Sequence, residues 1–413
     1  MTFVNFLREN VRWLLGAFLL TLFSSFGQTF FISLSAGHIR EEYSLSNGGF
    51  GTLYMAATLA SAMTLPHLGR IVDRYSPMHV TFLVAPMLAV AALMMSVSRS
   101  VALLLLTIYL LRLFGQGMMT HNALTATARW FAAQRGRAMS VVTQGVNAGN
   151  AIFPISFVVI AGAIGWRETW LLAAAVLVLV ALPAISLLVR TDRKPRASDP
   201  APKIAIGRDW TRKEVLRDPM LYLLLMGVMA PAFIGTSILF HQVYLVHSRG
   251  WSLEVFSSSF ALMSVVTTSF ALIAGHMVDK VSAVRLLPAF LLPLGLACLV
   301  LGFFSQEWSA FAFMTLYGIS NGFSWTLFGA LWVEVYGSRN LGSIRAVTES
   351  AMVLSSALGP GITGILMDRG VPLTVQIIAM GIYCLIVSFA MLRASRRIAS
   401  RIAGEAEALA MER

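Results

Sequence analysis

Long apolar runs separated by short polar breaks repeat along the whole chain. Each run is close to the roughly 20 residues that an α-helix needs to cross the hydrocarbon core of a bilayer. The breaks delimit twelve runs, which we expect to be membrane-spanning helices. Their expected ranges are 13–36, 50–70, 78–98, 101–128, 138–164, 168–190, 219–246, 254–275, 284–304, 308–335, 343–366 and 372–393.

The same pattern divides the chain into four regions. Residues 1–190 and residues 219–393 each hold six apolar runs, so we expect an N-terminal and a C-terminal six-helix half. Residues 191–218 are basic and rich in proline, which predicts a cytoplasmic linker. Residues 394–413 are expected to form a short cytoplasmic tail.

Composition and charge agree with a membrane protein. The chain is 57% hydrophobic and 12% charged, against roughly 25% charged residues in a soluble domain. A net charge of +12 would suggest a nucleic-acid partner in a soluble protein. Here most Lys and Arg residues fall in segments that face the cytoplasm if both termini do, as the positive-inside rule requires. We therefore expect contact with membrane lipid and no nucleic-acid partner.

An internal repeat appears at an offset of 206 residues. This offset carries Asp73 onto Asp279 and Pro154 onto Pro360 without a gap. Repeated halves of this kind are typical of transporters, in which the solute site lies between the halves near the middle of the membrane. The repeat predicts two parallel six-helix halves related by an axis along the membrane normal.

Both halves carry the motif G-x-x-x-D-[RK] after their second apolar run. The motif residues are Gly69, Asp73, Arg74, Gly275, Asp279 and Lys280. Glycine permits close approach of helices, while the carboxylate and the cation suit helix termini and ion pairs at a gate. With twelve runs and a repeat, the paired motifs make the chain resemble the major facilitator superfamily over its whole length. The resemblance implies an alternating-access transporter of the bacterial inner membrane.

Further segments resemble one branch of that superfamily, the monocarboxylate porters and oxalate/formate exchangers. They are Arg112-Leu-Phe-Gly-Gln-Gly117, Ala128-Arg-Trp-Phe, Arg135-Gly-Arg-Ala and Gly165-Trp-Arg167. This resemblance implies a small organic anion, such as a monocarboxylate, as the solute. The exchangers of the branch place cationic ligands in helices eight and eleven, whereas the eighth run here holds no interior cation.

Arg112 is the leading candidate for a solute ligand. It lies near the middle of the fourth apolar run, where a charge is costly and usually faces a cavity or a partner. Its guanidinium could hold a carboxylate through two parallel hydrogen bonds, or could instead brace helices by binding backbone carbonyls. Gln116 follows one turn later and is expected on the same face.

Other polar residues inside the expected helices either line the solute pathway or hold helices together. They are Gln28, His121, Asn122, Gln144, Asn147, Tyr317 and Asn321. Glu349 lies four residues after Arg345 near the cytoplasmic end of the eleventh run. It is expected either to pair with Arg345 or to act as a gate or proton-linked acid.

Several classes of function lack support in the sequence. The chain has no paired catalytic carboxylates, no G-x-S-x-G and no GxxxxGK[ST], so neither an enzyme nor a built-in ATPase is expected. Its seven histidines show no metal-ligand spacing, and we expect no metal site and no cofactor. Cys298 and Cys384 lie in apolar runs and are expected to be buried packing residues.

Three functions remain open from the sequence. Proton symport of a small organic anion is the leading hypothesis, because of Arg112 and the family resemblance. Proton-antiport efflux of amphipathic compounds is the alternative, favoured by an interior rich in Met and aromatic residues. A sensor that binds a solute without moving it is a third possibility. A monomer would suffice, since one chain of twelve helices encloses a complete pathway.

Overall fold

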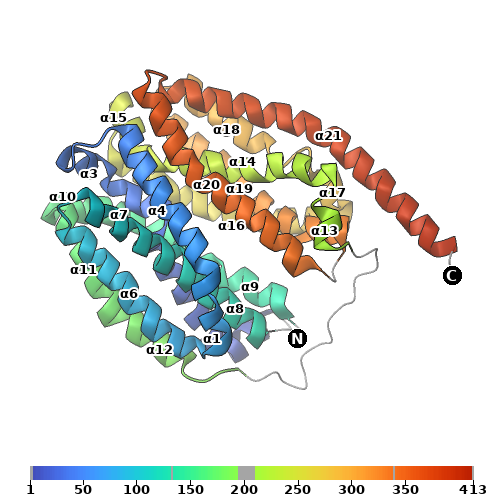
Figure 1. Cartoon of the computed structure of the whole chain (residues 1–413), viewed down its shortest axis with the longest axis horizontal. Helices are drawn as coiled ribbons and strands as arrows, with labels where there is room; N and C mark the ends of the chain where they lie inside the picture. The colour runs from blue at the N-terminus through green and yellow to red at the C-terminus, as the bar shows by residue number, and fades with distance from the viewer. Residues whose placement is uncertain (1–2, 132–133, 194–209, 338–339, 412–413) are drawn as a thin grey trace. The chain divides into compact units, whose positions relative to one another are not determined.

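The computed structural model describes residues 3–131, 134–193, 210–337 and 340–411. Within these ranges the chain is helical and has no strand (Figure 1). Apart from the four-residue helix Arg212–Val215, these helices form twelve successive runs. Eight described helices are long and apolar enough to cross a membrane. The bent pair Val4–Gly27 and Thr29–Glu42 makes a ninth, with an angle of 43° at the break. The predicted all-α membrane fold is confirmed.

The chain folds as two compact units. The first comprises Met1–Pro202 with Leu239–Tyr244, and the second comprises Lys203–Ile238 with Leu245–Arg413. The short segment in the first unit is held there by Gln242, whose Nε2 donates to the carbonyl of Phe30 at 2.9 Å.

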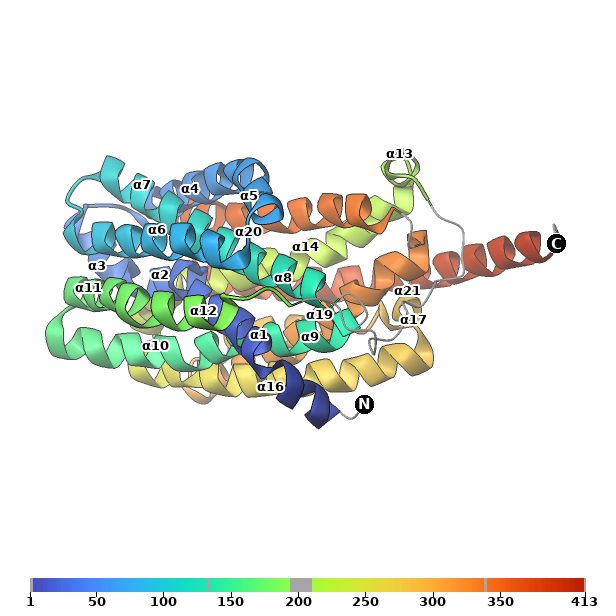
Figure 2. The ribbon, with the colours of Figure 1, turned by 90° about the horizontal axis from the view of Figure 1, so that it is seen from below.

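The first unit contains the first six helical runs. Its elements are α1 (Phe3–Phe23), η1 (Ser24–Gly27), α2 (Thr29–Ile32), η2 (Ser33–Ser35), α3 (Ala36–Glu42), α4 (Asn47–Leu68), α5 (Arg70–Arg74), α6 (Pro77–Val97), α7 (Val101–Leu110), the π-helix η3 (Leu111–Met119), α8 (Thr120–Trp130), α9 (Arg135–Val142), α10 (Gln144–Ile164), α11 (Trp166–Val176), the π-helix η5 (Leu177–Ala181) and α12 (Leu182–Val189). Helix α1 packs against α10, α12 and α8, while α6 lies beside α11 and α12 (Figure 2).

The second unit contains the remaining runs. Its elements are α13 (Arg212–Val215), α14 (Pro219–Phe240), α15 (Gln242–Arg249), α16 (Leu253–Val281), α17 (Ala283–Leu286), α18 (Leu292–Phe303), α19 (Trp308–Tyr336), α20 (Leu341–Asp368) and α21 (Leu373–Met411), of which α14 ends and α15 begins in the first unit. Helix α16 packs along α19, and α18 packs against both α19 and α21.

Local chemistry fixes several helix ends. The hydroxyl of Ser46 accepts from the backbone N–H of Gly49 at the start of α4, and Ser252 caps α16 in the same way. These caps satisfy N–H groups that the first helical turn leaves free. Gly337 follows α19 with φ of 84°, a conformation that side chains with a Cβ rarely adopt.

Three elements differ from the sequence-based expectation. Helix α21 continues to Met411 instead of ending near residue 393, because residues 394–411 contain no proline and many strong helix formers. The ninth run is divided into α17 and α18 around Pro288, which has no N–H to donate. The first G-x-x-x-D-[RK] motif lies at the break between α4 and α5, whereas the second lies within the last turns of α16.

Candidate functional site

Arg112 is buried in the first unit, in the π-helical segment η3. The residue is 4% exposed, and its Nη1 donates to the carbonyl of Gly27 at 3.2 Å and to Oγ1 of Thr29 at 3.3 Å. A π-helix shifts the backbone hydrogen bonds by one residue and is often found at functional sites. Arg112 therefore joins the middle of the fourth helical run to the middle of the first.

The acceptor carbonyl lies at a break in the first helical run. Gln28 has ψ of 153°, so the chain is extended between η1 and α2. A break of this kind deprives nearby carbonyls of the N–H groups that a continuous helix would supply. The Arg112 guanidinium supplies a donor to the Gly27 carbonyl in place of the helix.

Two glycines allow the backbones to meet at this crossing. A Cβ added at Gly27 would lie 2.1 Å from the Leu111 carbonyl oxygen and 2.9 Å from the backbone nitrogen of Gln116. A Cβ added at Gly115 would lie 2.6 Å from the Cα of Gly27. Of the predicted solute ligands, the structure therefore brings Gln28, Arg112 and Gln116 to one place.

An aromatic side chain completes the surroundings of the guanidinium. The Arg112 Cζ lies 5.5 Å from the centre of the Tyr54 ring, and the Tyr54 hydroxyl is 2.7 Å from Oγ1 of Thr29. The Tyr54 ring packs in turn against Phe240 at 4.7 Å. A cation held over an aromatic face is attracted to the ring and keeps a fixed orientation.

The guanidinium is not neutralised by an acidic side chain in the described part of the chain. Two ion pairs of the described residues join Arg167 to Glu42 and Arg401 to Asp218, and neither involves Arg112. The Nε of Arg112 is buried and makes no hydrogen bond within the same residues. An arginine stays charged in a membrane interior, and an unpaired buried charge is costly. The arrangement favours binding of an anion.

Two other predicted ligands in the fourth run lie away from Arg112. The ring of His121 is beside Gly69 and interacts with Asp73. Asn122 donates from Nδ2 to the carbonyl of Pro77 and to Oγ1 of Thr81, both at 3.2 Å. Asn122 therefore joins the third and fourth runs, and holding helices together is one of the two roles expected for such amides.

The remaining predicted ligands form contacts within their own helices. Asn147 donates to Oε1 of Gln144 at 2.9 Å, and both residues lie in α10. In the second unit the Tyr317 hydroxyl pairs with Asn321. The same hydroxyl is so close to α14 that a Cβ at Gly235 would lie 1.9 Å from it. Their role as solute ligands stays a prediction.

The predicted gating residues lie at helix ends or on exposed faces. Gly69 is buried, while Asp73, Arg74 and Lys280 are exposed. Gly275 is half-buried in α16, and the side chain of Asp279 lies outside the described residues. Glu349 is exposed on α20, and Arg345 donates to the Gly329 carbonyl at 2.8 Å.

The sequence-based analysis did not include Gly27, Thr29 and Tyr54. Glycines in two apolar runs were a signal for a close crossing, but nothing in the sequence indicated which helices would meet. Within the described residues, no three His, Cys, Asp or Glu side chains form a cluster that could hold a metal ion.

Residues 17–266 and 230–410 match the family model described as Major Facilitator Superfamily. A curated relative, described as a probable sulfoacetate transporter (SauU) of Cupriavidus necator, is 29% identical over 164 residues. That alignment covers 40% of this chain and only 38% of the relative.

Two solved structures are similar in fold. One is a bacterial homologue of the human lysosomal transporter Spinster in an inward-facing, unoccupied conformation. It has a TM-score of 0.74 and 17% identity, and covers 95% of this chain and 98% of that chain. The other is a mutant of the nucleoside transporter NupG, with a TM-score of 0.70 and 13% identity, covering 92% and 99%. The predicted fold of two six-helix repeats is confirmed.

Proposed function

This chain belongs to the Major Facilitator Superfamily, whose members are secondary transporters of small solutes, and on that premise we propose that its solute is a small organic anion. The observation that carries the proposal is the buried guanidinium of Arg112, which has no acidic partner among the described residues. A bound carboxylate or sulfonate would neutralise it through charge-assisted hydrogen bonds.

The contacts of Arg112 support a binding role as well as a bracing role. One Nη1 atom is used by the Gly27 carbonyl and by Thr29, while Nε is without a partner among the described residues. The two bonds and the Tyr54 ring fix the orientation of the guanidinium before the solute arrives. A preoriented group loses less conformational entropy on binding.

The similarity to a probable sulfoacetate transporter supports the same class of substrate. Sulfoacetate carries a carboxylate and a sulfonate, and both groups match the geometry of a guanidinium. Efflux of amphipathic compounds has no comparable support at the Arg112 site.

We extend the proposal to the energy source and the gate. Transport is coupled to protons, with Glu349 and His121 as candidate proton-linked groups, because carboxylates and imidazoles recur in membrane proton relays. The two G-x-x-x-D-[RK] motifs act at the cytoplasmic gate. The working protein is a monomer of the bacterial inner membrane with both termini in the cytoplasm, as the distribution of Lys and Arg favours.

The test is binding and uptake by the purified protein. Thermal unfolding is followed with sulfoacetate, monocarboxylates, dicarboxylates, neutral sugars and cationic drugs, since a ligand of the folded state raises the unfolding temperature. Uptake of the stabilising solute into proteoliposomes is then measured with and without an inward proton gradient. We expect stabilisation by an organic anion, and uptake that the gradient accelerates.

Arg112→Gln is the informative variant and Arg249→Gln is its matched control. Arg249 also donates to backbone carbonyls, those of Phe304 and Leu301, and lies 4.9 Å over the ring of Trp251. We expect Arg112→Gln to lose the stabilisation and the uptake, while Arg249→Gln keeps both. Stabilisation by cationic or neutral compounds alone, or normal anion uptake by Arg112→Gln, would refute the proposal.

A further inference from the structure

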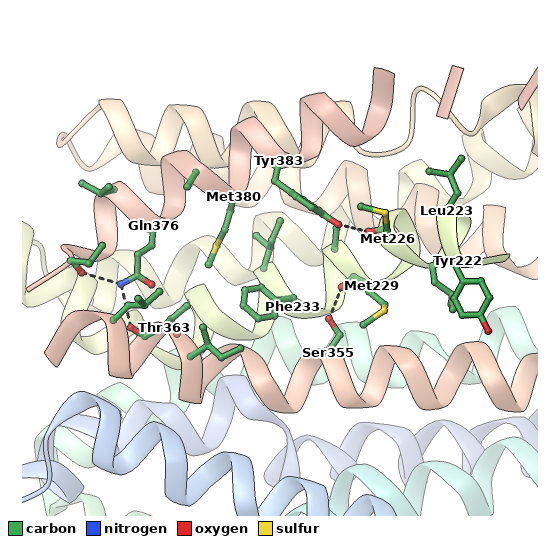
Figure 3. A pocket seen from close by; sticks show the side chains of 18 residues that line it. Tyr222, Leu223, Met226, Met229, Phe233, Ser355, Thr363, Gln376, Met380 and Tyr383 are labelled. Carbon is green, nitrogen blue, oxygen red and sulfur yellow. Dashed lines mark hydrogen bonds between the residues drawn. The ribbon is translucent and has the colours of Figure 1, made fainter. Parts of the chain in front are cut away.

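The second unit contains a long apolar groove between α14, α20 and α21 (Figure 3). Its volume is about 950 Å³. Met226, Ile362 and Val375 line it and are 49%, 41% and 52% exposed. All three belong to helices that are long and apolar enough to span a membrane. In a membrane these exposed side chains face lipid, so the groove opens to the bilayer.

One end of the groove carries an unused hydrogen-bond acceptor. Gln376 is 5% exposed, and its Nε2 donates to the carbonyls of Thr363 at 3.2 Å and Val371 at 3.0 Å. Because two carbonyls can only accept, the amide nitrogen must face them and Oε1 is left on the other side. Within the described residues Oε1 makes no hydrogen bond. A buried acceptor in this state favours a ligand with a donor.

The polar groups farther along the groove are already used by the protein. The Tyr383 hydroxyl donates to the carbonyl of Met226 at 2.9 Å, and Ser355 donates to the carbonyl of Met229 at 3.0 Å. Figure 3 shows both bonds between Gln376 at one end and Tyr222 at the other. The walls between these ends therefore present hydrocarbon to a ligand.

The length of the groove is close to that of one acyl chain, and its two ends lie in the first turns of α14 (Tyr222) and α21 (Gln376), which enter the membrane from opposite faces. Its lining residues on α14 extend from Tyr222 to Ile234, a distance of about 18 Å at the rise of an α-helix. One acyl chain spans half of a typical bilayer core, a depth of about 15 Å. Gln376 is in the first turn of α21, next to the chain segment that leaves the membrane, which places its acceptor at the level of lipid headgroups.

We propose that this groove binds a phospholipid of the leaflet at the Gln376 end, with an acyl chain along α14 and a headgroup donor on Oε1 of Gln376. The headgroup must carry an N–H or O–H group, as ethanolamine and glycerol headgroups do. Choline has no such hydrogen and cannot donate. The proposal is independent of the solute and of Arg112.

The experiment compares two lipids that differ only in this donor. Purified, delipidated protein is titrated with dioleoyl phosphatidylethanolamine or dioleoyl phosphatidylcholine, and bound lipid is counted by native mass spectrometry. The unfolding temperature is recorded in parallel. We expect the ethanolamine lipid to bind at least about tenfold more tightly, as one hydrogen bond to a charged donor contributes.

Two variants separate the acyl chain from the headgroup. Ala379 is exposed and lines the groove, so Ala379→Phe fills the groove without disturbing the core and should abolish binding of both lipids. Gln376→Met keeps the side-chain size and should make the two lipids equal. Ile386 is 63% exposed on the same helix but outside the groove, and Ile386→Phe should bind both lipids as the unchanged protein does.

Unchanged lipid binding by a folded Ala379→Phe protein would overturn the proposal. A preference for ethanolamine that persists in Gln376→Met would overturn the assignment of the headgroup to Oε1. If Gln376→Met fails to fold, Ala379→Phe still tests whether the groove binds lipid. If Ala379→Phe abolishes binding of a cationic or neutral drug but leaves lipid binding unchanged, the groove is a drug site and the proposal is refuted.

Discussion

Arg193 and Arg401 each contact the residue that ends the fourth helical run of their unit. Arg193, just after α12, donates to the carbonyl of Trp130, the last residue of α8. Arg401, in α21, lies with its guanidinium 5.7 Å from the ring of Tyr336, the last residue of α19. The 206-residue offset carries Trp130 onto Tyr336. One contact is a hydrogen bond to a backbone carbonyl and the other is a cation over a ring, but both link the end of the fourth run to the chain at or after the last run of the unit.

Removal of the second of these arginines should destabilise the protein. Arg401 forms an ion pair with Asp218 at 2.7 Å, and the Asp218 side chain is only 9% exposed. In Arg401→Ala this carboxylate loses its counter-ion, so we expect the free energy of unfolding to fall by roughly 1–3 kcal/mol. Thermal unfolding in detergent measures the change. Arg397→Ala, at an exposed position one turn earlier, is the control, and equal unfolding temperatures for the two variants would contradict the prediction.

The Gly27–Gly115 crossing should not tolerate a methyl group. In Gly115→Ala the new Cβ would meet the Cα of Gly27 at 2.6 Å, and backbone atoms cannot move away as a flexible side chain can. We expect a destabilisation of about 2 kcal/mol or more and a large loss of folded protein. Fluorescence-detected size-exclusion chromatography measures the yield. Gly162→Ala, where nothing lies within 4 Å of the added Cβ, should give the normal yield.

Thr29 should contribute to anion affinity by orienting Arg112. Thr29→Val removes an acceptor of the guanidinium and the partner of the Tyr54 hydroxyl. We expect the Kd of the anion to rise about three- to tenfold, since a hydrogen bond contributes about 1 kcal/mol. Isothermal titration calorimetry gives the Kd. Thr64→Val is the control, because Thr64 also pairs with a tyrosine hydroxyl, that of Tyr109, and an equal loss there would argue against a specific role.

Asp73 should affect the rate of transport more than the binding of solute. It is exposed beside His121 and distant in sequence from the Arg112 crossing, as expected for a gate. We expect Asp73→Asn to slow uptake about tenfold while the Kd stays within a factor of about two, because gating limits turnover. Initial rates in proteoliposomes and thermal-shift titration give the two quantities. Glu41→Gln removes an exposed carboxylate elsewhere and should change neither.

Membrane orientation can be tested with single cysteines. Cys298 and Cys384 are buried, so background labelling by a polar maleimide should be low. We expect Ser100→Cys to react in intact cells and Ser76→Cys to react only after permeabilisation, because the distribution of Lys and Arg places Ser76 inside. The reverse pattern would show that the orientation is inverted.

The apolar pattern predicted the twelve runs because bilayer thickness sets a minimum length for each of them. It did not predict the breaks within runs. Hydropathy does not reveal the extended residue Gln28 or the π-helix Leu111–Met119, because it depends on the side chains and not on the backbone conformation. Inside the protein the backbone groups at such breaks can still find hydrogen-bond partners. Helix α21 is longer than predicted because the apolar pattern ends near residue 393, whereas the residues that follow still have high helix propensity.

The candidate site was predicted only in part. The cost of a buried charge identified Arg112 from the sequence alone. The face shared with Gln116 was inferred for an α-helix, which η3 is not. His121 interacts with the second run and Asn122 with the third. The sequence did not predict these contacts, because they depend on which helices pack together. The repeat offset carries Arg112 onto Gly318, so the charge is not duplicated in the second unit.

Helix α21 provides a site for a rigid fusion that would help to image this small protein by electron microscopy. At 39 residues it is about 58 Å long, nearly twice the thickness of a bilayer core. A partner protein that begins with a helix could be joined in register after Ile402, without a flexible linker. The fused mass would move rigidly with the second unit and give electron micrographs of single particles a marker for alignment outside the detergent micelle.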